Sequence, residues 1–487
     1  MAVVKDSMQN RVYQATRQYG GYIQLFHNPV FRKKAIDNLN GRHIINLSTG
    51  FNLRDCAPVL VDQLASDATN PFLYRNYEAP SGHPLWIQSV LAHEIIKSSY
   101  ANQLSSKNIV VVAGSCVTFH YIARYLVENF DAPEVVAPVP TYAGFGENMA
   151  PFNIPVIEVV SDRSPGFMPT TEEVSDAITK NTKLIYTGWV NNPTGFVMDK
   201  FEAKKLLLLA KEKNVYLMWD ETQSTLVSDE CESVDMWEIA SELDAWDNLI
   251  VIASMSKDRG IPSNRSAWVI GPEQIVQRFV EYNGNLYSMP ATVLTGLVMK
   301  DLLFRSMAFL VKKDIEAGKA YDTFLDLVLK PLDIDDIYDK KVEYRFHQFL
   351  IPGLRRFLLD GFLDKGKVLA EYLEFNKWVI DGQRLFKSNF DMVVDMLDLN
   401  WDDFRFEMGG FNSFVHIPIL DKVNQQKFVE SMFVDAGIEI LPGPAFGLQP
   451  THWENQLGFW GRITLSSSAN LMIEGLNRML DYARKYR

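Results

Sequence analysis

The stretch FEAKKLLLLAKEKNVYLMWDE at residues 201–221 decides how the chain folds. Its first part has the charge and leucine pattern of an amphipathic helix, and VYLMW after it is a continuous apolar run closed by two carboxylates. Apolar runs of this kind, separated by amphipathic helices, are typical of parallel strands that are covered on both faces. The stretch therefore predicts an α/β fold with a mostly parallel sheet flanked by helices.

Similar apolar runs occur on both sides of this stretch, namely IVVVA at 109–113, EVVAP at 134–138, KLIYTG at 183–188 and LIVIAS at 249–254. We expect a large domain at residues 51–300, and an N-terminal arm at 1–50 that belongs to the small domain. GGFNSFVHIPI, GIEILPG and GRITLSS alternate strands with helices again, so a smaller C-terminal α/β domain is expected at 301–487.

A helical insertion is expected at about residues 300–400, where the pattern turns helical and aromatic residues are frequent at 344–378. We interpret the aromatic stretch as a packed helical layer or a subunit interface, because an acidic chain disfavours membrane contact. The role of the insertion stays open.

Composition argues against several classes of function. The 487 residues carry 48 Lys and Arg against 60 Asp and Glu, and this net charge of −12 opposes binding to nucleic acid or to an anionic membrane. No apolar run reaches the roughly 18 residues of a membrane span, and no targeting segment is recognised. Cys56, Cys116 and Cys231 have the spacing of neither a disulfide framework nor a zinc site. We expect a cytoplasmic protein without a metal.

Polar motifs follow three of the predicted strands. They are VNNPTG at 190–195, WDE at 219–221 and SMSKDRGIPSNR at 254–265. Open α/β sheets bind ligands beyond the carboxyl ends of their strands, so we expect these motifs to contribute to one site.

Five further motifs lie before and after these three. They are YEAPSGHPL at 77–85, AGSCV at 113–117, PTY at 140–142, PGPAFG at 442–447 and GRITLS at 461–466. With them the sequence resembles the aminotransferase class I/II family, whose enzymes have fold type I and use pyridoxal 5′-phosphate (PLP). The resemblance covers most of the chain. It also implies a homodimer with shared active sites.

The resemblance assigns the catalytic residues and the cofactor contacts. Lys257 is expected to form a Schiff base with PLP, Asp220 to keep the pyridine nitrogen protonated, and Tyr142 to stack on the ring. The remaining cofactor residues are expected to bind the phosphate and the phenolic oxygen of PLP, and Tyr77 is expected to reach across the dimer interface. These residues are Tyr77, Ser115, Cys116, Asn192, Gln223, Ser254, Ser256 and Arg265.

The resemblance also implies how a substrate binds. Arg462 is similar to the family arginine that holds the α-carboxylate of an amino acid through two parallel hydrogen bonds, with Gly50 and Asn192 beside it. Transamination, with a 2-oxo acid as the candidate acceptor, is the leading reaction. A PLP-dependent lyase, replacement or cyclising enzyme of amino-acid secondary metabolism would use the same intermediate and stays open. A non-catalytic sensor of PLP or of an amino acid is the third alternative.

Two features depart from the family pattern. Members usually carry a tyrosine three residues after the aspartate, where this chain has Gln223, so the electronic tuning of the cofactor is expected to differ. In addition, 205 positions separate Lys257 from Arg462. This interval exceeds that of typical members by on the order of seventy residues, and long unstructured loops are uncommon, which favours the helical insertion.

Overall fold

The chain is described from a computed structural model that covers residues 20–75, 77–161, 165–227, 233–332, 351–399 and 409–486. Its contacts divide it into two compact units. The first unit comprises Met1–Arg54, Ile122–Val234 and Gln383–Arg487, and the second comprises Asp55–Tyr121 and Asp235–Gly382. The division into domains expected at residues 50 and 300 stays a prediction.

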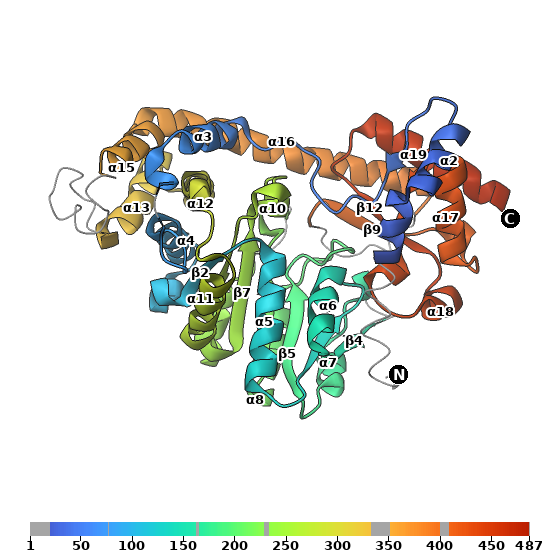
Figure 1. Ribbon diagram of the computed structural model, residues 1–487, viewed down its shortest axis with the longest axis horizontal. Helices are drawn as coiled ribbons and strands as arrows, with labels where there is room; N and C mark the ends of the chain where they lie inside the picture. Colours follow the sequence, from blue (N-terminus) through green and yellow to red (C-terminus); the bar gives the residue numbers. More distant parts are fainter. Residues whose placement is uncertain are drawn as a thin grey trace. The chain divides into compact units, whose positions relative to one another are not determined.

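Four parallel strands form the centre of the first unit, in the order β6-β5-β3-β4 (Figure 1). They are β3 (Glu134–Pro138), β4 (Val156–Val159), β5 (Thr182–Gly188) and β6 (Tyr216–Asp220). The sequence predicts β3, β5 and β6 to within one residue. It does not predict β4, because most residues of this edge strand are only half buried and give no continuous apolar run.

The helices of this part of the first unit are α6 (Ala143–Met149), α7 (Thr171–Ala177) and α8 (Lys200–Lys213). α5 (Ser115–Asn129) begins in the second unit and continues into the first from Ile122 onward. The helix expected at 201–214 is α8. Its first turn is capped by Asp199, whose side chain accepts a hydrogen bond from Glu202 N at 2.8 Å, and Asn214 ends it in the left-handed conformation. The capping residues and the leucine-rich buried face therefore both favour a helix with these bounds.

The C-terminal part of the first unit also contains residues from the beginning of the chain. An antiparallel sheet is formed by β11 (Leu441–Pro442), β12 (Trp460–Thr464) and β9 (Asn412–His416), while β1 (Ile45–Asn46) pairs in parallel with β10 (Ile438–Glu439). The helices around these strands are α2 (Pro29–Asn38), α17 (Gln425–Ala436), α18 (Pro450–His452) and α19 (Ala469–Tyr486) (Figure 1). One aromatic core holds them together, in which the Phe414 ring lies 5.9 Å from those of both Phe446 and Trp453.

The second unit contains three antiparallel strands in the order β2-β8-β7: β2 (Ile109–Val112), β7 (Leu249–Ser254) and β8 (Ala267–Ile270). The sequence predicts β2 and β7 but not the short strand β8. The prediction of a mostly parallel sheet is confirmed, and β8 departs from it, because it pairs antiparallel with both β2 and β7. Strands that are buried on both faces have the same apolar pattern in either direction, so the pattern does not determine the direction of pairing.

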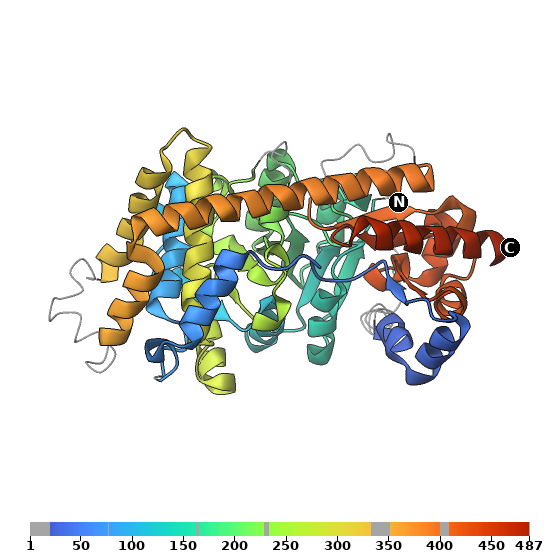
Figure 2. The ribbon, with the colours of Figure 1, turned by 90° about the horizontal axis from the view of Figure 1, so that it is seen from above.

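The other described elements of the second unit are mainly helices: α3 (Pro58–Ala68), α4 (Pro84–Lys97), α9 (Met236–Leu243), α10 (Met255–Asp258), α11 (Glu273–Tyr287), α12 (Thr295–Val311), α13 (Ala317–Leu329) and α15 (Ile351–Leu358). α16 (Lys365–Leu397) begins in the second unit, and its residues from Gln383 onward belong to the first. α16 has 33 residues and is unbroken (Figure 2). Residues 344–350 of the aromatic stretch lie outside the described residues, but Phe357, Phe362 and Phe375 in the rest of it are buried. Over the described ranges, no helix is both long and apolar enough to cross a membrane.

A buried carboxylate, Asp67, lies between α3 and α12. It is 1% exposed, and it accepts hydrogen bonds from Gln63 Nε2 at 2.7 Å and from Leu297 N at 2.9 Å. Any side chain at Gly296 would overlap the carboxylate. Burial, the largest influence, raises the pKa of Asp67 to about 7.

We predict that the Asp67→Asn variant has a flatter dependence of stability on pH. The folded-state pKa of Asp67 lies above the unfolded value of about 3.9, so ionisation in the folded protein is unfavourable and the parent protein loses stability as the pH rises from about 4 to 7. The asparagine does not ionise. In urea unfolding, the free energy of unfolding of the variant minus that of the parent should increase by on the order of 1–3 kcal/mol between pH 5 and pH 8.

Asp62→Asn is the control, because Asp62 lies on the same helix with an exposed side chain. Equal pH dependence of the Asp67→Asn variant and this control would contradict the prediction.

Candidate active site

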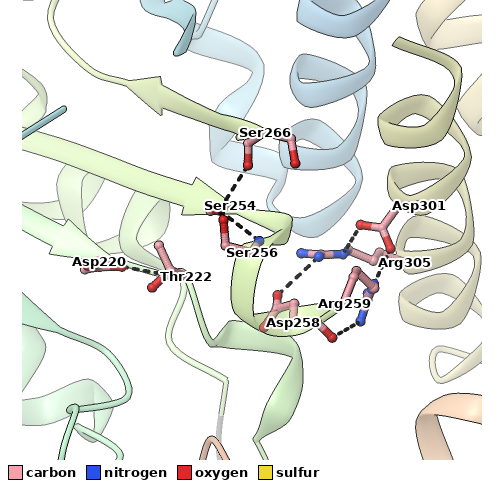
Figure 3. Close-up of polar contacts among 9 residues, drawn as sticks. All are labelled: Asp220, Thr222, Ser254, Ser256, Asp258, Arg259, Ser266, Asp301 and Arg305. Atoms are coloured by element: carbon pink, nitrogen blue, oxygen red, sulfur yellow. Dashed lines mark hydrogen bonds and ion pairs between the residues drawn. The ribbon is translucent and has the colours of Figure 1, made fainter. Parts of the chain in front are cut away.

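The turn that carries Lys257 begins where the buried strand β7 ends. Ser254 caps α10, since Ser256 N donates to Ser254 Oγ at 3.0 Å. The Ser254 hydroxyl oxygen also lies 2.9 Å from Ser256 Oγ and 3.0 Å from the carbonyl oxygen of Ser266 (Figure 3). Both serines are buried, whereas Lys257 is partly exposed. The strand end therefore holds the two predicted hydroxyl groups and the lysine in one short, fixed turn.

A buried ionic cluster follows Lys257 and fastens this turn to α12 (Figure 3). Arg305 Nη2 lies 3.1 Å from Asp258 Oδ2, and Arg305 Nε lies 2.7 Å from Asp301 Oδ2. Arg259 Nε donates to Asp301 Oδ1, and its guanidinium lies 5.0 Å from the Phe375 ring of α16. These two positive and two negative groups are at most 8% exposed, and their pairing offsets the cost of burying each charge.

Gly114 lies between β2 and the N-terminus of α5, close to the guanidinium of Arg265. Gly114 has φ +93, and a Cβ there would overlap the guanidinium of Arg265. Arg265 is itself in the left-handed conformation (φ 53) and donates from Nη1 to the carbonyl oxygen of Pro262 at 2.9 Å. Only glycine thus lets the guanidinium approach the first turn of α5, which begins at Ser115 and Cys116. A guanidinium beside helix N–H groups is a typical setting for a phosphate.

Asp220 is the last residue of β6 in the first unit. It is 9% exposed, and its Oδ1 accepts from Thr222 N at 2.9 Å (Figure 3). Its Oδ2 accepts from the hydroxyl of Tyr186 at 3.0 Å. Donors on both oxygens favour the ionised form of a buried carboxyl group.

Two further predicted cofactor residues belong to the first unit. The side chain of Tyr142, which precedes α6, packs over Gly144, because a Cβ on that glycine would lie 2.5 Å from the Tyr142 ring. Gln223 is 7% exposed and lies against Gly410, where a Cβ would come within 2.6 Å of Gln223 Oε1. The expected effect of Gln223 on the cofactor stays a prediction.

Arg462 lies on β12 with its guanidinium buried in the first unit. Nη1 donates to Asn192 Oδ1 at 3.0 Å and Nη2 to the carbonyl oxygen of Ser48 at 2.7 Å. The group lies 5.0 Å from the Phe446 ring, and a Cβ at Gly50 would be 3.4 Å from Nη2. The structure therefore brings together Arg462, Asn192 and Gly50, the three predicted substrate residues.

The predicted residues fall into two groups, one in each unit. Tyr142, Asn192, Asp220, Gln223, Gly50 and Arg462 belong to the first unit, and Ser115, Cys116, Ser254, Ser256, Lys257, Arg265 and Tyr77 belong to the second. Tyr77 is 82% exposed. Sequence reasoning missed Tyr186 and Ser48, because a tyrosine within a buried strand and a serine two residues before a glycine give no signal of their own.

The aminotransferase class I and II family matches the chain over residues 42–307, which is more than half of the 487 residues. The chain belongs to this family.

Curated relatives match shorter parts. The aspartate aminotransferase of Pyrococcus horikoshii is 25% identical over 208 residues, which are 43% of this chain and 51% of that protein. Transaminase BacF of Bacillus subtilis is 26% identical over 261 residues, 53% of this chain and 63% of BacF. The chain spans about half the length of the curated relatives it matches.

Solved structures support the fold over nearly the whole chain. The crystal structure of the aspartate aminotransferase from Rhizobium meliloti aligns with a TM-score of 0.67, covering 93% of this chain and 94% of that one at 16% identity. The predicted α/β architecture, fold type I, is confirmed.

Enzymes of this family depend on PLP, and each unit has residues that fit a part of it. In the second unit, the Arg265 guanidinium occupies the space that a Cβ at Gly114 would fill, and so lies close to the start of α5, an arrangement that fits the phosphate. In the first unit, the buried carboxylate of Asp220 fits a protonated ring nitrogen, and the Tyr142 ring offers an aromatic face. The chain's residues therefore fit the cofactor.

We predict that Gly114→Ala destabilises the cofactor-free protein by more than the backbone conformation alone requires. A left-handed conformation costs an alanine about 1–2 kcal/mol, and here the new methyl group must also displace Arg265. The Gly114→Ala, Arg265→Ala double variant should regain the part of the loss that comes from the overlap. Urea unfolding measures these free energies.

Gly41→Ala is a matched control, because Gly41 has φ +88 and a Cβ there would meet no neighbouring atom within 4 Å. A loss at Gly114 no larger than that at Gly41 would show that Arg265 does not occupy this space.

Proposed function

We propose that the chain is an aminotransferase that moves the amino group of an α-amino acid to a 2-oxo acid. The proposal is supported by family membership and by relatives that are named aspartate aminotransferase and transaminase. The observation that carries it is the buried guanidinium of Arg462, whose plane is fixed by Ser48 and Asn192. A fixed, planar donor pair is what recognition of an α-carboxylate requires.

PLP, when bound, supplies an electron sink that stabilises negative charge at the α-carbon of an amino acid. We assign to Lys257 the amine that holds the cofactor and that accepts and returns the α-proton at Nζ. Asp220 holds the proton on the ring nitrogen, and Tyr142 covers one face of the ring. The phosphate is assigned to Ser115, Cys116, Ser254, Ser256 and Arg265, and the phenolic oxygen to Asn192.

We also propose a homodimer in which Tyr77 completes the site of the partner subunit. Tyr77, Tyr74 and Leu286, all in the second unit, are 82%, 52% and 58% exposed. Exposed apolar side chains of this size favour a role in an interface. A cytoplasmic location is proposed as well, supported by Cys56 and Cys116, which are not joined in a disulfide, whereas Cys231 lies outside the described residues.

We predict that borohydride reduction of the PLP-loaded protein attaches the cofactor to Lys257, since this is the lysine at the end of β7 beside Ser256. Peptide mapping should find the label there, and Lys257→Ala should lose it. Lys300 is the internal comparison, because its amine is 2% exposed but is paired with Glu371 at 2.7 Å.

Label on Lys300 or on any other lysine would overturn the assignment. The same protein, given single amino acids and a 2-oxo acid, should form the matching keto acid and the new amino acid in equal amounts. Elimination or cyclised products in their place would favour the lyase or cyclising alternative.

We predict that Arg462→Lys weakens amino-acid binding by about 10- to 100-fold, the usual effect of losing a hydrogen bond between charged groups. A lysine cannot offer two parallel donors or keep the bonds to both Ser48 and Asn192. The absorbance of bound PLP should remain, because Arg462 is assigned to the substrate. Titration of the cofactor spectrum with an amino acid measures the affinity.

Arg484→Lys is the control, since Arg484 lies in the last turn of α19 with a side chain 65% exposed. Amino-acid affinity that is equal in the two variants would refute the role of Arg462.

A further inference from the structure

The hydroxyl of Tyr186 is a buried polar group with a specific partner that the proposed roles do not use. Tyr186 is 3% exposed, and its hydroxyl donates to Asp220 Oδ2 at 3.0 Å. A phenol inside a sheet is satisfied by any acceptor, but here the acceptor is the carboxylate that we assign to the ring nitrogen.

The strand register explains how Tyr186 reaches this carboxylate. In the parallel pair β5 and β6, Gly188 is opposite Asp220 and Tyr186 is opposite Met218. Residues two apart on a strand point to the same face, so Tyr186 is the diagonal neighbour of Asp220. Gly188 has no side chain to lie between them, and a Cβ there would come within 2.9 Å of the carbonyl oxygen of Val190.

The ring of Tyr186 is fixed from its other side by α6. Phe145 of this helix is fully buried and stacks on Tyr186, with ring centroids 4.2 Å apart and ring planes at 10°. The same helix begins directly after Tyr142, whose ring packs over Gly144. Phe145 N also donates to the carbonyl oxygen of Tyr142 at 3.1 Å, so the first turn of α6 links Tyr142 to Phe145, and the stacked Tyr186 ring links Phe145 to Asp220.

We propose that Tyr186 is a positioning residue for Asp220. Together, Tyr142, Phe145, Tyr186 and Asp220 then hold the two groups that contact the cofactor ring, the Asp220 carboxylate and the Tyr142 ring, in fixed positions relative to each other. This inference rests on the proposed function, which places the ring nitrogen at Asp220. Thr222 N and the Tyr186 hydroxyl each occupy one carboxylate oxygen, so the plane of the carboxylate is set before a ring binds. A hydrogen bond from the phenol also makes the carboxylate a weaker proton acceptor, which leaves the proton on the ring nitrogen.

The test compares PLP-loaded proteins that contain PLP labelled with ¹⁵N at the ring nitrogen. Tyr186→Phe keeps the stacked ring but removes the donor. The expected results are a loss of PLP affinity of about tenfold and a ¹⁵N resonance that moves towards that of an unprotonated ring. Tyrosine replaced by 3-fluorotyrosine at position 186, a stronger donor of nearly the same shape, should move the resonance in the opposite direction.

Tyr216→Phe is the matched control, because Tyr216 lies on β6 with Asp220 and its hydroxyl is 3.4 Å from that of Tyr125. It should change neither the affinity nor the resonance. In an Asp220→Asn background, Tyr186→Phe should have no further effect on the resonance.

Tyr186→Phe protein with the same resonance and PLP affinity as the Tyr216→Phe protein would overturn the inference. So would shifts in the same direction from Tyr186→Phe and from 3-fluorotyrosine, because loss of packing alone would not depend on donor strength. If the parent protein took up no PLP, the proposed function would fail instead, so the two failures are distinguishable.

Discussion

Burial of charged side chains at strand ends is the constraint on which this structure depends. A charge removed from water needs partners, and the buried charged groups described above have partners that fix their positions. In the second unit, two arginines and two aspartates pair directly after Lys257 and fasten α10 to α12. In the first unit, Asp220 has a backbone and a phenol donor, and Arg462 is held by Asn192 and Ser48. The same contacts that make burial tolerable also orient the groups.

Much of the fold is predictable from the sequence because it depends on local signals. Continuous apolar runs mark β3, β5, β6 and β7 nearly to the residue, and Asp199 and Asn214 mark the ends of α8. β4 and β8 were missed for different reasons. β4 is only half buried, while β8 is a short run of four residues whose antiparallel direction depends on partners distant in the sequence.

The candidate site is predictable where a motif carries the chemistry. Asn192, Asp220, Lys257, Arg265 and Arg462 were named from their motifs, and the structure brings Arg462 to Asn192. Tyr186 and the ionic cluster on α12 are different, because they are recognised only from contacts between residues 34 to 47 positions apart in the sequence. A tyrosine or an aspartate in a buried segment is compatible with many partners, and only the packed structure selects one.

The pairing of β1 with β10 has a consequence for synthesis on the ribosome. Ile45 is in register with Ile438, and its N–H donates to the carbonyl oxygen of Gly437 at 2.8 Å. Leu47 packs so closely on Gly475 that a Cβ there would lie 2.7 Å from Leu47 Cδ2. The first unit is assembled from three separate segments, and the last of them starts at Gln383. Nascent chains that end before this segment therefore expose the apolar residues of the N-terminal part, whereas both segments of the second unit have by then been made. Vectorial translation thus delays completion of the first unit, and with it the Arg462 contacts, until the segment that begins at Gln383 has been made.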